Sequence, residues 1–222
     1  MTPPTTPNVA AFDLDGTLTD GGSVFLWLRY LAGTSLAYRA ALRLAVPLTV
    51  GALRSGPSAD RAKERLFLAL LAGRDLDEVT AASRDFELEH LAREGRPEVL
   101  ARLAWHLAQG HDVVIVSASP ELYVQVVADA LGAGGALGTR LAVDARNRLT
   151  GGYLGQNCRG DEKLRRLREW IEARGYEQAP VVYAYGNSRG DRRMLAQATH
   201  PFNVGKLGWL GSLRRYPRAP RD

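Results

Sequence analysis

Two aspartates one residue apart near the N-terminus constrain this chain more than any other feature. Asp13 and Asp15 follow an apolar run at residues 9–12 that is typical of a buried strand, and Gly16 and Thr17 come next. If the strand continued through both aspartates, alternation would place their carboxylates on the same side. Like charges so close repel each other unless a cation or a proton intervenes. Oxygen-only ligands favour Mg²⁺, so a magnesium site is expected here. The alternative interpretation is a plain strand end with an Asp-Gly turn.

Three later segments carry polar side chains of the kind that aspartate-based phosphoryl transfer uses. A run of Val and Ile ends at the hydroxyl of Ser117, and Lys163 follows Gly-Asp-Glu at the start of a helical pattern. A further strand pattern leads into a loop that contains Asn187 and Asp191. Strands that alternate with helices indicate a mainly parallel sheet, in which ligands bind beyond the carboxyl ends of the strands. We therefore expect these segments to meet at one edge of the sheet.

The order Asp-x-Asp, Ser, Lys and then an Asn/Asp loop resembles the four motifs of the haloacid dehalogenase (HAD) superfamily of phosphotransferases. The likeness covers residues 8–20 and 96–205. Each motif alone is weak, whereas all four in order are a strong signal. The resemblance implies an α/β fold, with a doubly wound, Rossmann-like parallel sheet and a helical C1-type cap inserted after the first strand.

Apolar patterns along the chain predict how it is organised. We expect a core at residues 8–19 and 96–205, a helical cap at 20–95 and a basic tail at 206–222. In the cap, helical patterns run to residue 53 and resume after a break at 54–58. The further predicted helices lie at 61–71, 75 or 77 to 91, 97–108, 121–131, 161–174 and 191–198. Later strands are expected at 112–117, 140–143, 148–154, 181–185 and, at a sheet edge, 202–205, with a loop at 132–138.

The residues and the resemblance together suggest a role for each polar group. A carboxylate such as Asp13 can accept a phosphoryl group, and Asp15 can serve first as general acid and then as general base. Lys163 would neutralise Asp13 and its phosphoryl adduct as a catalytic and substrate-binding residue. Thr17 and Ser117 would contact the phosphoryl group. Helix capping is the alternative for Ser117, but Ser119 is better placed for that role, directly before Pro-Glu.

Magnesium is the expected cofactor, with Asp13, Asp15, Asn187 and Asp191 as its ligands. The resemblance assigns the backbone carbonyl of Asp15 to the metal. Asn187 stands where the family usually has an aspartate; its amide oxygen can still coordinate a hard cation, but the site carries one less negative charge. Asp191 can coordinate directly or through water, and its alternative role is the N-cap of the following helix.

Composition excludes several classes of protein, beginning with disulfide-stabilised ones. The 222 residues contain a single cysteine, Cys158, which excludes an intramolecular disulfide framework and fits a reducing cytoplasm. The formal net charge is +5, and part of the excess lies in the tail, which we expect to be solvated. No nucleic-acid partner is expected. Residues 1–7 lack the basic start and apolar core of a secretion signal, and the apolar stretch at 44–53 is too short to span a bilayer.

The cap sets substrate choice in this superfamily, and the chain is most similar to subfamily IB, with its phosphoserine phosphatases and its phosphatidylglycerophosphate phosphatase type. Gly22 stands where the phosphoserine enzymes have a glutamate. The apolar early cap and residues 157–163 are more similar to the phospholipid-phosphate type, for which peripheral membrane contact is a minority interpretation. We expect a magnesium-dependent hydrolase of small or lipid-linked phosphate monoesters. The alternatives are a phosphotransferase to an alcohol, a phosphoserine phosphatase or a non-catalytic phosphate-binding protein.

Overall fold

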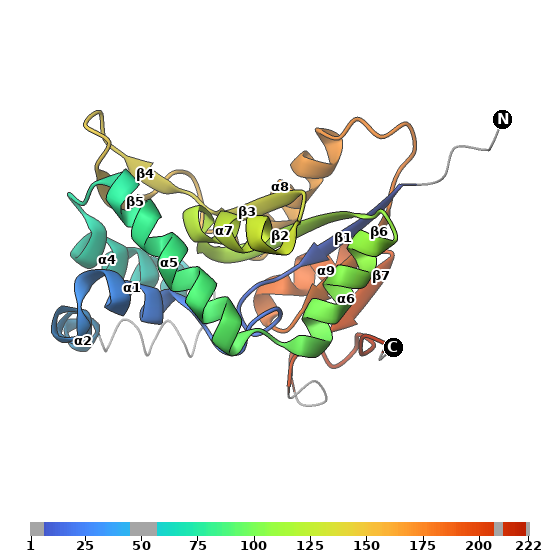
Figure 1. The fold of residues 1–222 in the computed structure, drawn as a ribbon, viewed down its shortest axis with the longest axis horizontal. Coiled ribbons are helices and arrows are strands. Elements are labelled where there is room, and N and C mark those ends of the chain that lie inside the picture. The colour runs from blue at the N-terminus through green and yellow to red at the C-terminus, as the bar shows by residue number, and fades with distance from the viewer. Residues whose placement is uncertain (1–6, 45–56, 207–210, 221–222) are drawn as a thin grey trace.

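The computed structural model describes residues 7–44, 57–206 and 211–220. The expectations for residues 1–6, for the helical stretch beyond 44, for the break at 54–56 and for residues 207–210 and 221–222 of the tail lie outside these ranges. Figure 1 shows two parts, with a group of helices at one end of the molecule and the main sheet with its flanking helices at the other.

A five-stranded, wholly parallel sheet forms the core, in the order β3-β2-β1-β6-β7. In register, Ala10 of the central strand lies opposite Val113 on one side and Tyr183 on the other. The chain builds the sheet outward from β1 to β3 and then crosses to the other side of β1, so β1 and β6 lie at a topological switch point. The strands are β1 (Asn8–Phe12), β2 (Asp112–Pro120), β3 (Gly135–Thr139), β6 (Val181–Gly186) and β7 (His200–Asn203).

Helices cover both faces of this sheet. Alternation along β1 sends Ala10 and Phe12 into one apolar cluster and Val9 and Ala11 into another, so the strand is buried on both sides. The first cluster includes side chains of α6 (Pro97–Ala108) and α7 (Glu121–Leu131). The second includes side chains of α8 (Asp161–Glu172) and α9 (Arg192–Gln197). The doubly wound α/β fold predicted from the sequence is thereby confirmed.

Between β1 and α6, the described residues form four helices, which we call the cap. The Asp75 side chain caps α5 by accepting hydrogen bonds from the amides of Asp77 and Glu78. The two connections to the core run side by side, because Asp20 N donates to Glu94 O at 2.8 Å. None of the described helices is long and apolar enough to cross a membrane. The cap helices are α1 (Val24–Ala32), α2 (Thr34–Arg43), α4 (Pro57–Leu71) and α5 (Leu76–Glu94).

A two-stranded hairpin from the core sequence packs on the cap. The two short strands predicted here form β4 (Leu141–Val143) and β5 (Leu149–Tyr153), which pair antiparallel. Tyr153 Oη donates to the carbonyl of Asp60 in α4 at 3.3 Å. The hairpin therefore joins the second half of the chain to the cap, as Figure 1 shows.

Two expectations about the core and the tail are wrong. The loop expected at 132–138 contains strand β3, which the pattern missed because the sequence Gly-Ala-Leu-Gly-Thr has few residues of strand type. The tail is not simply solvated across its described part. Leu213 is buried, Asn203 N donates to Pro217 O at 2.8 Å, and Arg102 donates to Pro220 O at 2.9 Å. Apolar burial and backbone hydrogen bonds fix this segment against the core despite its charge.

Glycines in β3 permit the close packing that the sequence pattern did not reveal. A Cβ at Gly138 would lie 2.3 Å from the Cα of Glu121 in α7, which is shorter than any tolerable contact. We expect Gly138→Ala to lower the free energy of unfolding by about 1–3 kcal/mol, because the helix must move away from the strand. Urea unfolding measures this. Gly22→Ala is the control, since Gly22 has open space around it, and an equal loss in both variants would contradict the interpretation.

Candidate active site

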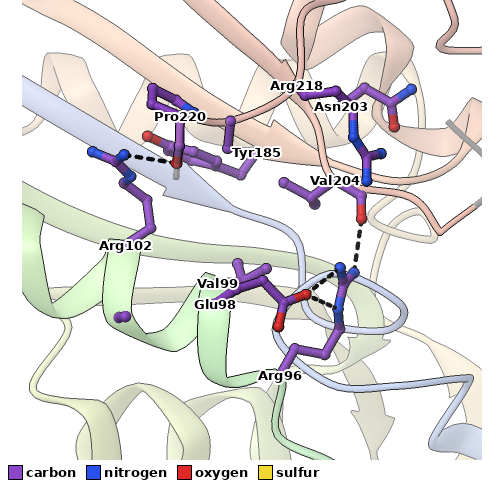
Figure 2. Close-up of a pocket in the computed structure, with 11 residues that line it drawn as sticks. Arg96, Glu98, Val99, Arg102, Tyr185, Asn203, Val204, Arg218 and Pro220 are labelled. Carbon is purple, nitrogen blue, oxygen red and sulfur yellow. Dashed lines mark hydrogen bonds and ion pairs between the residues drawn. The ribbon is translucent and has the colours of Figure 1, made fainter. Parts of the chain in front are cut away.

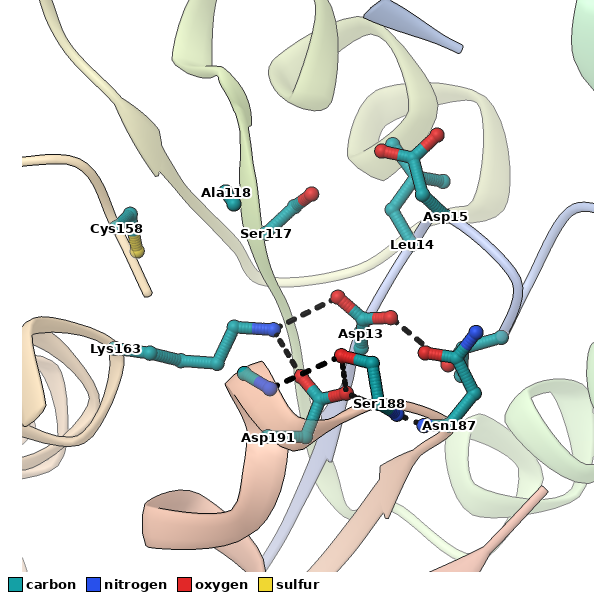
Figure 3. Close-up of polar contacts among 12 residues, drawn as sticks. Asp13, Leu14, Asp15, Ser117, Ala118, Cys158, Lys163, Asn187, Ser188 and Asp191 are labelled. Atoms are coloured by element: carbon teal, nitrogen blue, oxygen red, sulfur yellow. Dashed lines mark hydrogen bonds and ion pairs between the residues drawn. The ribbon is translucent and has the colours of Figure 1, made fainter. Parts of the chain in front are cut away.

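Asp13 lies at the carboxyl end of the central strand and is held there by three neighbours. Its amide donates to Tyr185 O at 3.0 Å, which extends the pairing with β6 by one residue. Its buried carboxylate accepts hydrogen bonds from Lys163 Nζ at 2.7 Å and from Thr17 Oγ1 at 2.9 Å. Figure 3 shows the carboxylate at the centre of the polar group. Thr17 thus orients Asp13, and its contact with substrate stays a prediction.

Lys163, in the first turn of α8, bridges two carboxylates. Its Nζ lies 2.7 Å from Asp13 and 2.5 Å from Asp191, and all three side chains are buried. Burial opposes the charge on Lys163, but the two ion pairs outweigh it and raise the pKa of the ammonium group. Burial and the nearby Asp191 raise the pKa of Asp13 to about 7, against the opposing effect of Lys163. Two carboxylates with one ammonium group leave an excess of negative charge that a cation would balance.

The loop after β6 holds Asp191 firmly. Its second carboxylate oxygen accepts hydrogen bonds from Asn187 N at 3.2 Å and from Ser188 N and Oγ, both at 2.9 Å. The alternative role of Asp191 as a side-chain cap of the following helix is not observed, because its side chain turns back to this loop. A short 3₁₀ turn, Arg189–Asp191, intervenes before α9.

Asn187 lies beside Asp13, as Figure 3 shows. Gly16 makes room for it: its φ of +77° suits glycine, and a Cβ there would lie 1.9 Å from Asn187 Nδ2. The described residues contain no group of three or more His, Cys, Asp or Glu side chains placed to hold a metal ion. A cation would therefore need amide and backbone oxygens as well as carboxylates. Oxygen donors of this kind suit magnesium, so the residues present fit the expected ion.

Asp15 has a different environment from Asp13. The strand ends at Phe12, and the chain then turns so that the amides of Thr17, Leu18 and Thr19 all point to Leu14 O. The strand therefore does not continue through both aspartates, so the condition under which alternation would place them on one side is not met. Asp15 instead accepts hydrogen bonds from Ser23 N at 2.6 Å and from Ser119 Oγ.

Ser117 and Ser119 lie near the end of β2, and Ser119 does not have the capping role predicted for it. Ser119 does not cap α7, which has no side-chain cap, because its hydroxyl donates to Asp15. Ser117 is buried and its Oγ accepts a hydrogen bond from Ser119 N at 3.1 Å. Its hydroxyl hydrogen remains available to a ligand, and Figure 3 shows Ser117 on the same side of the site as Asp13 and Lys163. Its contact with a phosphoryl group stays a prediction.

Sequence reasoning missed a lysine and an asparagine that connect the cap to this site. Lys63 Nζ, from α4, donates to Ala118 O at 2.7 Å and to Asn157 Oδ1 at 2.6 Å. Only three lysines occur in the chain, so the rarity of this residue was the available signal. Asn157 precedes Cys158, which is buried and whose thiol pKa rises to about 11 because of burial. This thiol is structural rather than nucleophilic.

A second missed feature is a pair of buried polar side chains on α5. Neither the Glu87 carboxylate nor the His90 ring has a hydrogen-bond partner in the part of the chain that the structure describes. Burial, with a smaller effect of Asp15, raises the pKa of Glu87 to about 8, while burial lowers that of His90. Both side chains are therefore neutral near pH 7.

Arg96 supports the turn that follows the aspartates. Its guanidinium donates to Gly16 O and to Val204 O, both at 2.8 Å, and also binds Glu98. Figure 2 shows it at the edge of a cavity that α6 shares with the C-terminal segment. Neither Asp13 nor Lys163 lines this cavity, so it is separate from the site described above.

Comparison with known proteins agrees with this geometry. Residues 10–196 match the model of the haloacid dehalogenase-like hydrolase family, and the chain belongs to this family. It is 35% identical to protein CicA of Caulobacter vibrioides, covering 86% of this chain and 83% of CicA. It is 26% identical to a histidinol-phosphatase of Neisseria meningitidis, covering 89% of this chain and 90% of the relative.

Superposition on a solved structure also confirms the fold. The phospho-aspartyl intermediate analogue of a phosphoserine phosphatase superposes with a TM-score of 0.67 at 18% identity, over 98% of this chain and 96% of that one. The predicted family and enzyme class, a HAD-type hydrolase whose relatives include phosphatases, are confirmed. The individual roles assigned to the site residues stay predictions.

The unpartnered Glu87 makes stability depend on pH. Between its ordinary pKa of 4.5 and about 8, the unfolded chain ionises while the folded chain keeps the carboxyl protonated, so stability falls as the pH rises through this window. Glu87→Gln removes this loss, and we expect it to gain about 1–3 kcal/mol on the wild type between pH 5 and pH 8. Urea unfolding at both pH values measures the difference. Glu89→Gln, exposed on the same helix, is the control; a gain that does not change with pH would disprove the assignment.

Proposed function

We propose that this protein is a magnesium-dependent phosphomonoester hydrolase that acts through an aspartyl-phosphate on Asp13. The observation that carries the proposal is the buried bridge from Lys163 to Asp13 and Asp191 at the carboxyl end of the central strands. A site that only bound phosphate would have no need of a buried carboxylate at its centre, since that charge repels the ligand.

The first half of the reaction follows from the position of Asp13. A carboxylate oxygen of Asp13 attacks the phosphorus atom, the bond from phosphorus to the ester oxygen breaks, and the phosphoryl group is transferred to Asp13. Lys163 keeps Asp13 oriented and balances the charge of the phosphoryl oxygens. Thr17 fixes the carboxylate from the other side, and the Ser117 hydroxyl donates to the phosphoryl group.

Asp15 donates a proton in the first half-reaction and accepts one in the second. When protonated, it gives its proton to the departing ester oxygen; as a carboxylate, it then takes a proton from the water that hydrolyses the aspartyl-phosphate. The hydroxyl of Ser119 can donate or accept, so its contact with Asp15 is compatible with both protonation states. The Ser23 amide holds the other oxygen and fixes the direction of the carboxyl group.

Magnesium completes the charge balance. We assign it to the Asp13 carboxylate, the backbone carbonyl of Asp15, the Asn187 amide oxygen and Asp191, directly or through water. When bound, the ion neutralises phosphoryl oxygens and so reduces their repulsion from Asp13. Asn187 contributes no charge, so the affinity for the ion is lower than an aspartate at this position would give.

The substrate is a phosphorylated small molecule or a lipid-linked phosphate ester. The similarity to a histidinol-phosphatase and to a phosphoserine phosphatase fold supports the first, while the apolar early cap supports the second. Gly22, at the place of the glutamate of phosphoserine enzymes, argues against phosphoserine as the natural substrate. The buried free thiol of Cys158 suits the reducing cytoplasm, where we place the protein.

Replacement of the nucleophile tests the mechanism directly. We expect Asp13→Asn to lower kcat by about 10³-fold or more on a phosphomonoester, because the amide cannot form the covalent intermediate. In the wild type, mass spectrometry of acid-quenched enzyme should find a phosphoryl group on Asp13. Asp129→Asn, an exposed aspartate on α7, is the control and should keep full activity. A phosphoryl group found on another residue would reject this mechanism.

Asn187 stands where the family usually has an aspartate, and this difference allows a second test, of the proposed magnesium site. Asn187→Asp adds a charged oxygen ligand, so we expect the magnesium concentration for half-maximal rate to fall by about tenfold. Gln178→Glu adds the same charge in an exposed loop and should leave this concentration unchanged. A magnesium requirement that rises in Asn187→Asp would show that residue 187 does not coordinate the ion.

A further inference from the structure

Lys63 reaches from the cap to the end of β2 and to the segment before α8, both in the core. It lies on α4, and its ammonium group bonds to the carbonyl of Ala118, which lies between Ser117 and the serine that contacts Asp15. Its second partner, the amide oxygen of Asn157, is in turn held by Thr139. The Lys63 side chain is neither fully buried nor fully exposed, so part of it is accessible to a ligand between the cap and the core.

The charge of Lys63 has no direct counterion. Both partners of its ammonium group are neutral oxygens, and no carboxylate lies within ion-pair distance among the described residues. Asp60 is one step removed, because the amide of Asn157 donates to it at 2.6 Å. In contrast, Lys163 bridges two carboxylates and Lys206 pairs with Asp20. One of the three donors of Lys63 remains for a ligand.

A second cation lies next to it. Arg159 packs its Cγ and Nε over Gly190, the residue before Asp191, and it is close enough to Lys63 to lower the pKa of that lysine. Its guanidinium is half-buried and has no hydrogen-bond or ion-pair partner in the described ranges. Neither cation has a carboxylate within ion-pair distance among the described residues, so the two repel each other, and an anion between them would remove the repulsion.

We propose that Lys63 and Arg159 form a second anion subsite, which binds an anionic group on the alcohol part of the substrate. The inference rests on the proposed function, since it assumes that the phosphoryl group occupies the site beside Asp13. In the core, Lys163 contacts the phosphoryl group. Lys63 comes from the cap and can therefore bind the remainder of the substrate. The substrate class is then a phosphate monoester that also carries a carboxylate or a phosphodiester.

The protonation of Lys63 agrees with this role. Burial lowers its pKa to about 8, while Asp60, Asp15 and Cys158 act in the opposite direction and Arg159 adds to the lowering. The ammonium form is therefore dominant at pH 7. Binding of an anion would stabilise it further, and affinity for the second anion should weaken as the pH rises above 8.

Paired substrates test the subsite. Phosphoserine and phosphoethanolamine differ only by a carboxylate, and glycerophosphoglycerol phosphate differs from glycerol 3-phosphate by a glycerophosphoryl group, which contains a phosphodiester. We expect Lys63→Met to lower kcat/KM by about tenfold or more for the preferred ester that has the second anion, mainly through KM, and by less than about threefold for its partner. Arg159→Met should show the same selectivity, Lys63→Arg should restore most of it, and Lys206→Met should have no effect. The pair that responds tells whether the natural anion is a carboxylate or a phosphodiester.

Equal losses on both members of each pair would overturn the subsite and leave Lys63 as a tether between cap and core. Thermal melting of each variant separates such a loss from unfolding. Calorimetric binding of the four esters to Asp13→Asn, with and without Lys63→Met, keeps the test independent of turnover. A preference for the second anion that Lys63→Met abolishes supports the subsite even if the wild type hydrolyses none of these esters. Equal binding of both members, or no binding of any ester, overturns it.

Discussion

The buried ammonium group of Lys163, shared by two carboxylates, is the interaction on which the rest of the site depends. Removing one partner from such a buried group leaves an uncompensated charge and costs about 3–5 kcal/mol, so the three side chains must be placed together. They come from the end of β1, the start of α8 and the loop after β6. The parallel order of the sheet brings these three segments to one edge, and the switch point between the two directions of winding leaves room there.

Around this bridge, backbone contacts connect the catalytic loops to the cap. Arg96 lies just after the second linker and holds the carbonyl of Gly16, in the turn that contains the aspartates. Arg96 N also donates to Leu18 O at 2.8 Å, so the end of the cap is fixed to the turn from which the cap begins. A movement of the cap about its two connections to the core would therefore displace the same turn that carries Asp15.

The fold and the chemical groups were predictable because their signals are local in the sequence. Apolar runs define β1, β2 and β6, and each motif residue lies within a few positions of a strand or helix end. What could not be predicted depends on contacts over long distances. Strand β3 exists because glycine allows α7 to approach it closely, and Ser119 turns to Asp15 because the strand before that aspartate ends early. The burial of Leu213 likewise depends on a surface formed by other segments.

This contrast has a physical reason that bears on specificity. The groups that handle a phosphoryl group must satisfy one fixed chemistry, so they recur as short motifs next to regular elements. The groups that recognise the remainder of a substrate need only reach the same space, and here they come from α4 and from the segment before α8, where Lys63 and Asn157 are 94 positions apart. No pattern in the chain links Lys63 to Asn157 and Arg159. Their proximity follows from the way the hairpin β4–β5 folds onto the cap. The choice of substrate therefore depends on tertiary contacts and not on a sequence motif.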